Sequence, residues 1–246
     1  MNDKPLVNWQ ERLAESAKAV AALERPSLST ISLRGGVMSL NSVPVPGNKL
    51  LCVIVASAFE NQYFDKPFDP NVKENPLCFA LSADGKDMVP HDNSKEKQAN
   101  VCEMCPQMAW GSDPRPNSKG KACKQKRRLA LLPHAALESD KIKSAEMAVM
   151  TIPVMSAKNW ANYVNQVASQ SARPPWAVLT EVSCHPDPRK QFEIRFELKA
   201  LVHEQFLDDV HGRIEGAMQV LMQPYEVAPP EQEQKAPVDD GKKRKF

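Results

Sequence analysis

The sequence predicts an α+β fold of mainly antiparallel β structure, built on a small barrel or curled sheet with flanking helices. Short apolar or alternating segments recur between turn residues, as strands do, whereas helical periodicity is confined to both ends of the chain and one stretch between them. The 21 prolines and nine glycines favour extended and turn segments over long helices. With 42% hydrophobic and 25% charged residues, a chain of 246 residues can bury a core without disulfides.

Helical periodicity predicts three helices. Apolar residues at three- and four-residue steps span Leu6–Arg25, and Pro26 ends that pattern. The spacing of the apolar residues between Trp160 and Val167 indicates a second helix. The third helix repeats its apolar residues on one face from Phe206 to Leu221.

The strands are predicted from alternation, from continuous apolar runs and from the turns between them. Gly35-Gly36 separates two alternating segments, and Leu50–Phe59 is a β-branched apolar run typical of a central strand. After a turn at His185–Pro188, Gln191–Leu198 alternates as a half-buried antiparallel strand does. Residues 61–76 are predicted to form a loop. The predicted strands are 30–34, 37–40, 50–59, 77–81, 127–132, 145–154, 177–182 and 191–198.

We expect three parts along the chain: an N-terminal helix in residues 1–26, a single β-rich domain in residues 27–223 and a disordered tail in residues 224–246. The tail resembles those of single-stranded DNA-binding proteins, which end in acidic residues and a phenylalanine and recruit replication or recombination proteins. Here the end is basic, and a plain solubilising extension is the alternative.

A polar stretch from Ser82 to Lys126 shows no secondary-structure pattern, and a loop of that length needs something to order it. Cys102 and Cys105 form a C-x2-C pair, and Cys123 follows after seventeen residues. Two thiols at this spacing can face one ion. The sequence therefore predicts a zinc-binding insertion at about residues 78–128.

A closed tetrahedral zinc site needs a fourth ligand, for which Cys78 and His91 compete. Four sulfur ligands leave no open coordination position, so the zinc is expected to be structural. A redox pair and plain free thiols are the alternatives. Cys52 and Cys184 lie in strand patterns and are expected in the core.

A basic segment without acidic residues follows the first two of these cysteines and surrounds the third. Its members are Arg115, Lys119, Lys121, Lys124, Lys126, Arg127 and Arg128. A solvated face is the plain interpretation. Trp110, an aromatic residue in a polar context, favours binding of single-stranded DNA instead, because such proteins combine cations on phosphates with aromatic rings under bases.

Other aromatic positions leave alternatives open. Trp110 could equally pack over the zinc site. Tyr63, Phe64 and Phe68 form a second stacking set, with packing against the sheet as the competing interpretation.

Enzymatic function is not expected, because the sequence holds no phosphate-binding loop, no catalytic triad and no metal-binding carboxylate pattern. The formal net charge of only +2 places any attraction to nucleic acid in local clusters. The chain has no apolar run of membrane-spanning length and no secretion signal, so we expect no membrane partner and a cytoplasmic location.

Several motifs resemble a widespread family of tailed-phage proteins, some of them described as single-stranded DNA-binding or replication-associated. The similarity runs from about Ile31 to Leu198, and the cysteine segment is its most specific part. The motifs are Ser32–Gly36, Pro46–Leu50, Phe59–Asn61, Cys78–Ala80, Cys102–Pro106, Trp110–Ser112, Gly120–Cys123 and Arg127–Leu129.

The resemblance implies Cys78 as the fourth ligand, an OB-like barrel, and a role in phage DNA replication or recombination within the host cell's cytoplasm. The alternative function is a zinc-stabilised protein-interaction module, either a replisome adaptor or an inhibitor of a host protein.

Overall fold

The computed structural model describes residues 29–66, 74–137, 141–188 and 190–225, together with Trp9, Arg12, Leu13 and Ser16. These four residues are α-helical, and the rest of the predicted N-terminal helix lies outside the described residues. Almost all of the predicted tail also lies outside them. Within the described part, no helix is long and apolar enough to cross a membrane.

The fold is mixed α+β, and the chain divides into two compact units. The first contains residues 1–57 and 128–221, and the second contains residues 58–127 and 222–246. The strands are β1 (Ser29–Arg34), β2 (Val37–Leu40), β3 (Val43–Pro44), β4 (Lys49–Tyr63), β5 (Cys78–Ser82), β6 (Lys124–Pro133), β7 (Ala148–Ile152), β8 (Val178–Asp187) and β9 (Gln191–Leu201). The helices are α2 (Val154–Ser171), α3 (Glu204–His211) and α4 (Ile214–Leu221).

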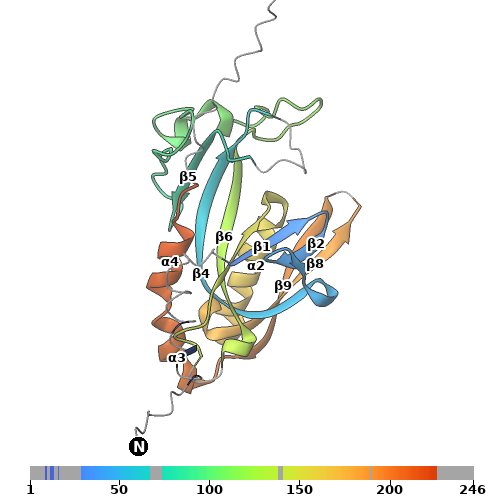
Figure 1. Cartoon of the computed structure of the whole chain (residues 1–246). Helices are drawn as coiled ribbons and strands as arrows, with labels where there is room; N and C mark the ends of the chain where they lie inside the picture. The colour runs from blue at the N-terminus through green and yellow to red at the C-terminus, as the bar shows by residue number, and fades with distance from the viewer. Residues whose placement is uncertain are drawn as a thin grey trace, which may run out of the picture. The chain divides into compact units, whose positions relative to one another are not determined.

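The sheet of the first unit is strongly curled, as Figure 1 shows, and has the strand order β3-β2-β1-β7-β6-β4-β8-β9. The predicted curled sheet is confirmed at this level. β1 and β2 form an antiparallel hairpin whose turn residues Gly35 and Gly36 have φ of 59° and 79°, a conformation that favours glycine. β1 also pairs with β7 in parallel, which the alternation of side chains cannot reveal.

Helix α2 packs on β9 through hydrogen bonds as well as apolar contacts. The Ile194 amide donates to the Ser156 hydroxyl at 2.9 Å, and the Asn159 side chain donates to the Ile194 carbonyl at 2.8 Å. Trp160 and Tyr163 contact Phe196 with ring centroids 5.3 and 5.6 Å apart. The predicted helix and half-buried strand are therefore confirmed, and they enclose one side of the core.

Several predicted boundaries are wrong. The strand predicted for residues 145–154 is only β7, because Val154 already begins α2. The third helix is two helices, because the chain turns at Gly212 and Arg213, and the Arg213 guanidinium donates to the Ala145 carbonyl at 2.8 Å. The turn predicted at His185–Pro188 begins later, since β8 continues to Asp187. The loop predicted from residue 61 starts after Tyr63, because β5 pairs with the end of β4 from Phe59↔Ser82 to Tyr63↔Cys78.

Replacement of Ile194 tests the packing of α2 on the sheet. Ile194 is fully buried, so Ile194→Ala should lower the free energy of unfolding by about 2–5 kcal/mol through lost contacts and a new cavity. Denaturant titration followed by circular dichroism measures the change. Glu197→Ala on the same strand, where the carboxylate is exposed, should change it by less than about 1 kcal/mol. Equal losses in the two variants would contradict this packing.

Candidate functional site

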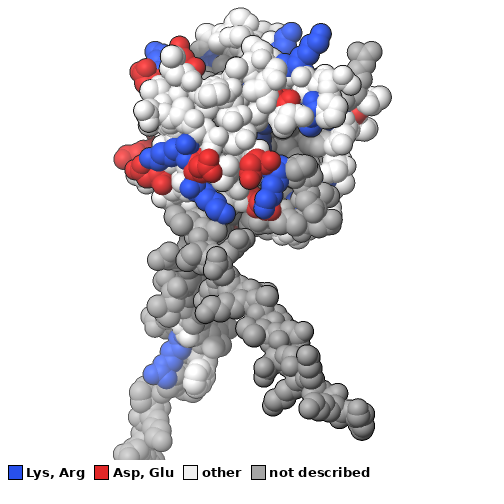
Figure 2. Space-filling model, turned by 90° about the horizontal axis from the view of Figure 1, so that it is seen from above, with Lys and Arg blue, Asp and Glu red and all other residues white. Residues whose placement is uncertain are grey.

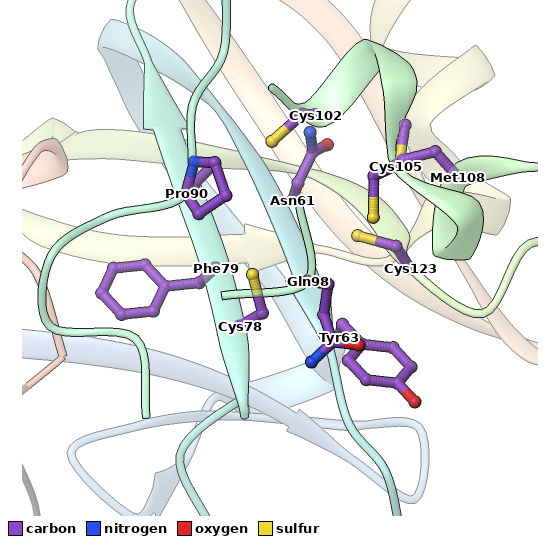
Figure 3. Close-up of a pocket in the computed structure, with 11 residues that line it drawn as sticks. Asn61, Tyr63, Cys78, Phe79, Pro90, Gln98, Cys102, Cys105, Met108 and Cys123 are labelled. Atoms are coloured by element: carbon purple, nitrogen blue, oxygen red, sulfur yellow. The ribbon is translucent and has the colours of Figure 1, made fainter. Parts of the chain in front are cut away.

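The four predicted cysteine ligands line one small cavity in the second unit, of about 10 Å³. Cys78 begins β5, Cys102 and Cys105 flank a single 3₁₀ turn, and Cys123 directly precedes β6. In Figure 3 the side chains of Cys105 and Cys123 point toward one another, and those of Cys78 and Cys102 lie across the cavity from them. A volume this small suits a single ion.

Backbone hydrogen bonds hold the three later cysteines in place. The Cys102 amide donates to the Met88 carbonyl at 2.9 Å, and the Cys105 amide donates back to the Cys102 carbonyl at 3.2 Å. The Cys123 amide donates to the Gln107 carbonyl at 2.9 Å. The polar insertion is thus folded back on itself around the cavity, although it contains no strand and only short 3₁₀ turns between β5 and β6.

Burial raises the pKa of the Cys123 thiol to about 12, and the neighbouring Cys102, Cys105 and Cys78 add to this shift. Burial also raises the pKa of Cys102, while the Asn61 side chain opposes that shift by donating a hydrogen bond to the sulfur. All four cysteine side chains line the same cavity. A divalent cation among them would favour the thiolates over the thiols.

The donor set fits zinc better than any hard cation, because the cavity presents sulfur and no carboxylate. All six cysteines are free thiols. Within the described ranges, no group of three or more cysteine, histidine or acidic side chains has the arrangement of a metal site. The four thiols are therefore gathered around one cavity without coordination geometry.

The competing ligand, His91, does not line the cavity. Its ring stacks on Phe79 with centroids 4.9 Å apart, and its Nδ1 accepts a hydrogen bond from the Asn93 amide at 3.0 Å. Cys52 and Cys184 are buried, as predicted, and do not belong to the cluster.

Trp110 lies at the surface, with 79% of the residue exposed, and it does not cover the cavity. The ammonium of Lys121 lies 5.2 Å from the centre of its ring. Two hydrogen bonds close the loop around it: the Gly111 amide donates to the Gly120 carbonyl at 2.9 Å, and the Ala122 amide to the Ser112 hydroxyl at 2.8 Å. The exposed indole therefore belongs to a braced loop, that is, a loop whose conformation is fixed by hydrogen bonds.

The basic segment is less uniformly basic than its sequence predicts, because Asp113, two residues before it, pairs with two of its cations. The Asp113 side chain is only 3% exposed and binds the Arg115 guanidinium at 2.6 Å and the Lys124 ammonium at 2.8 Å. These two cations hold the pKa of the Asp113 carboxyl well below its usual range. Arg115 keeps 73% of its side chain exposed, and Lys119 is exposed as well.

The last three basic residues of the segment are engaged with the chain itself. Lys126 donates to the Gln62 side chain, and the Arg127 guanidinium lies 3.4 Å from the centre of the Phe59 ring. Arg128 is buried and donates to the Leu221 carbonyl at 3.0 Å. A buried guanidinium cannot reach a phosphate, so Arg128 is not part of a binding surface.

Figure 2 shows one face of the molecule on which basic and acidic side chains stand beside one another, with uncharged areas between them. This mixture agrees with the small net charge of +2. Of the second aromatic set, Tyr63 lines the cysteine cavity and Phe64 is 37% exposed. Phe68 lies outside the described residues.

Sequence reasoning missed two parts of this unit. Asn61 lines the cysteine cavity from β4. Tyr225 donates to the Glu60 carboxylate at 2.7 Å, and its ring meets that of Phe79 edge-on at 4.9 Å. Asn61 ends the Phe59–Asn61 motif, to which no role was assigned, and Tyr225 belongs to no motif. The pairing of β4 with β5 places Asn61 beside the strand that begins with Cys78.

Replacement of Asp113 tests whether it braces the loop. Asp113→Asn removes the charge that Arg115 and Lys124 share, so the free energy of unfolding should fall by about 1–2 kcal/mol at neutral pH, with the exposed Arg115 pair contributing least. The folded-state pKa of Asp113 is lowered, so this difference is present above about pH 4 and shrinks as the pH falls further. Thermal unfolding at several pH values measures it.

Glu103→Gln is the matched control, because this carboxylate is exposed in the same unit. It should leave stability within about 0.5 kcal/mol of the unmodified protein. A difference for Asp113→Asn that grows below pH 4 would contradict the ion-pair explanation.

The geometry therefore offers a four-cysteine cavity and a braced loop that exposes one indole beside basic side chains. Comparisons of the chain with protein families, with curated proteins and with solved structures found no match.

Proposed function

We propose that this protein is a non-catalytic single-stranded DNA-binding protein whose basic loop is ordered by a structural zinc ion. The observation that carries the proposal is Trp110, which is 79% exposed and held beside Lys121. An exposed indole offers a flat apolar face on which a base can stack. The ammonium of Lys121 beside the ring can neutralise the phosphate that adjoins such a base.

The proposed contact uses three basic side chains of the loop that carries the indole. An unpaired base stacks on the face of Trp110, and Lys119, Lys121 and the exposed edge of Arg115 neutralise neighbouring phosphates. The hydrogen bonds from Gly111 and Ala122 already order the loop, so binding loses less conformational entropy. Stacking and phosphate contacts read no base edge, so binding should tolerate many sequences.

Zinc belongs to the proposal as a structural cofactor. Cys78, Cys102, Cys105 and Cys123 would hold it, and bound zinc supplies cross-links that replace the apolar core which the polar insertion lacks. The fold detail that we propose is an OB-like barrel with a zinc-binding insertion. The resemblance of the cysteine and Trp110 motifs to tailed-phage proteins supports a role in phage DNA replication or recombination in the host cytoplasm.

A second candidate is a zinc-stabilised protein-interaction module, acting as a replisome adaptor or as an inhibitor of a host protein. Met104 favours it, because this apolar side chain is 82% exposed at the turn between Cys102 and Cys105. Val89 and Val101, in the same unit, are also exposed. A partner retained from nuclease-treated host lysate by the unmodified protein and lost with Met104→Ser would favour this candidate.

Metal content tests the zinc part of the proposal. Elemental analysis of protein purified without added metal should find one zinc per chain, and Cys123→Ser should lose it, because a serine hydroxyl is a poor zinc ligand. Cys184→Ser is the matched control, since that buried cysteine lies outside the cavity. Zinc retained equally by both variants would remove Cys123 from the ligand set.

Oligonucleotide titration tests the DNA part. The zinc-loaded protein should bind a fluorescent single strand more tightly than the duplex, and Trp110→Ala should weaken binding by about 1–3 kcal/mol through loss of base stacking. The affinity should fall steeply with salt. Lys119→Gln and Lys121→Gln should each reduce the slope of log K against log salt by about 0.7.

Lys97→Gln is the control for charge, because Lys97 is exposed in the same unit and pairs with Asp92 at 2.6 Å. Its salt slope should equal that of the unmodified protein. Absence of binding to a single strand at low salt would end this proposal, and an unchanged affinity in Trp110→Ala would remove the stacking site.

A further inference from the structure

Strand β4 places a buried hydrogen-bond donor at the edge of the cysteine cavity. Asn61 is only 4% exposed and lines this cavity together with Cys102. Its side-chain amide nitrogen donates to the sulfur of Met88 at 3.4 Å. Figure 3 shows the Asn61 amide beside Cys102 at the edge of the cavity.

Such a donor matters because a four-thiolate zinc site is strongly charged. Four thiolates and one divalent cation carry a net charge of −2, and three of the four cysteines are buried. A buried negative charge is costly unless donors point at it. An N–H group aimed at a sulfur stabilises the thiolate far more than the neutral thiol.

A second polar side chain lines the same cavity and provides a comparison. The Gln98 amide nitrogen donates to the Glu96 carbonyl at 3.3 Å, and its oxygen accepts from Gln107 at 3.4 Å. Both polar groups of the Gln98 side chain are therefore hydrogen-bonded to residues of the loop. Asn61, in contrast, directs its donor group at a sulfur atom.

We propose that Asn61 is a positioning residue of a mononuclear four-cysteine zinc site: its amide orients Cys102 and stabilises the thiolate charge. The inference rests on the zinc part of the proposed function. It adds a residue from a strand that contributes no ligand, and it is independent of DNA binding. A partner of this kind outside the coordination shell typically changes metal affinity 10–100-fold.

Zinc affinity tests the inference through competition with a chromophoric chelator. Asn61→Leu keeps a similar volume and removes the donor, so it should bind zinc about 10–100-fold more weakly than the unmodified protein. Asn61→Val is a second donor-free variant with a side chain that suits a strand. Gln98→Leu should bind zinc as the unmodified protein does, because its amide is directed at the loop.

A spectroscopic measurement separates this role from general packing. With Co²⁺ as the probe, loss of the N–H donor should raise the energy of the Cys102 sulfur lone pairs. The sulfur-to-cobalt charge-transfer band should then move to longer wavelength in Asn61→Leu and Asn61→Val, and not in Gln98→Leu. Far-UV circular dichroism of each variant checks that the sheet is retained.

Each result has one meaning. Weaker zinc binding with the band shift, or complete loss of metal with the circular dichroism unchanged, supports the inference. Unaltered affinity and band position in both Asn61 variants overturn it, as does loss of the sheet signal, which would make Asn61 a folding residue. If the unmodified protein takes up no zinc or cobalt, the zinc part of the proposed function fails, which is a distinct outcome.

Discussion

The polar insertion between β5 and β6 can hold a fixed shape only if something other than an apolar core gathers it, and the cysteine cavity is the feature around which it folds. The nearby apolar cluster consists of Ala80, Met88 and Cys102, with Phe59 packed against it, and one of these residues is itself a predicted ligand. Backbone hydrogen bonds from Cys102, Cys105 and Cys123 close the turns around the cavity. In the proposed function, bound zinc would cross-link the four cysteines and so hold the insertion in this conformation.

The exposed loop depends on the same arrangement. Cys105 and Cys123 bracket the segment that carries Trp110, so a cross-link between these sulfurs fixes both ends of it. Asp113 then binds two cations inside the loop and leaves the outer edge of Arg115 free. In the proposed function, this arrangement would hold the stacking ring and the phosphate-binding side chains in one place, as binding without recognition of base edges requires.

The sequence predicted those parts of the structure that depend on local pattern. The apolar run in β4, the Gly35-Gly36 turn and the spacing of Cys102 and Cys105 are all local signals. Parallel pairing of β1 with β7 and the break at Gly212 depend on distant neighbours, so periodicity could not show them.

The site shows the same division between local and distant information. The resemblance favoured Cys78 over His91 as the companion of the later cysteines, and all four cysteines line one cavity. The sequence assigns no role to Asn61 or Asp113, because an amide or a carboxylate acquires its role only from the partner that folding brings to it. Arg128 has the residue type of a phosphate ligand, yet the strand buries its side chain. Charge counting cannot distinguish it from Lys119.

X-ray absorption at the zinc edge of the purified protein measures most directly which atoms coordinate the metal. The account predicts a first shell of four sulfur atoms at about 2.3 Å and no nitrogen or oxygen ligand. A shell containing nitrogen would replace one cysteine by histidine, with His91 the first candidate. Protein that carries no zinc, or zinc bound by fewer than three sulfurs, would contradict the claim that these cysteines order the basic loop.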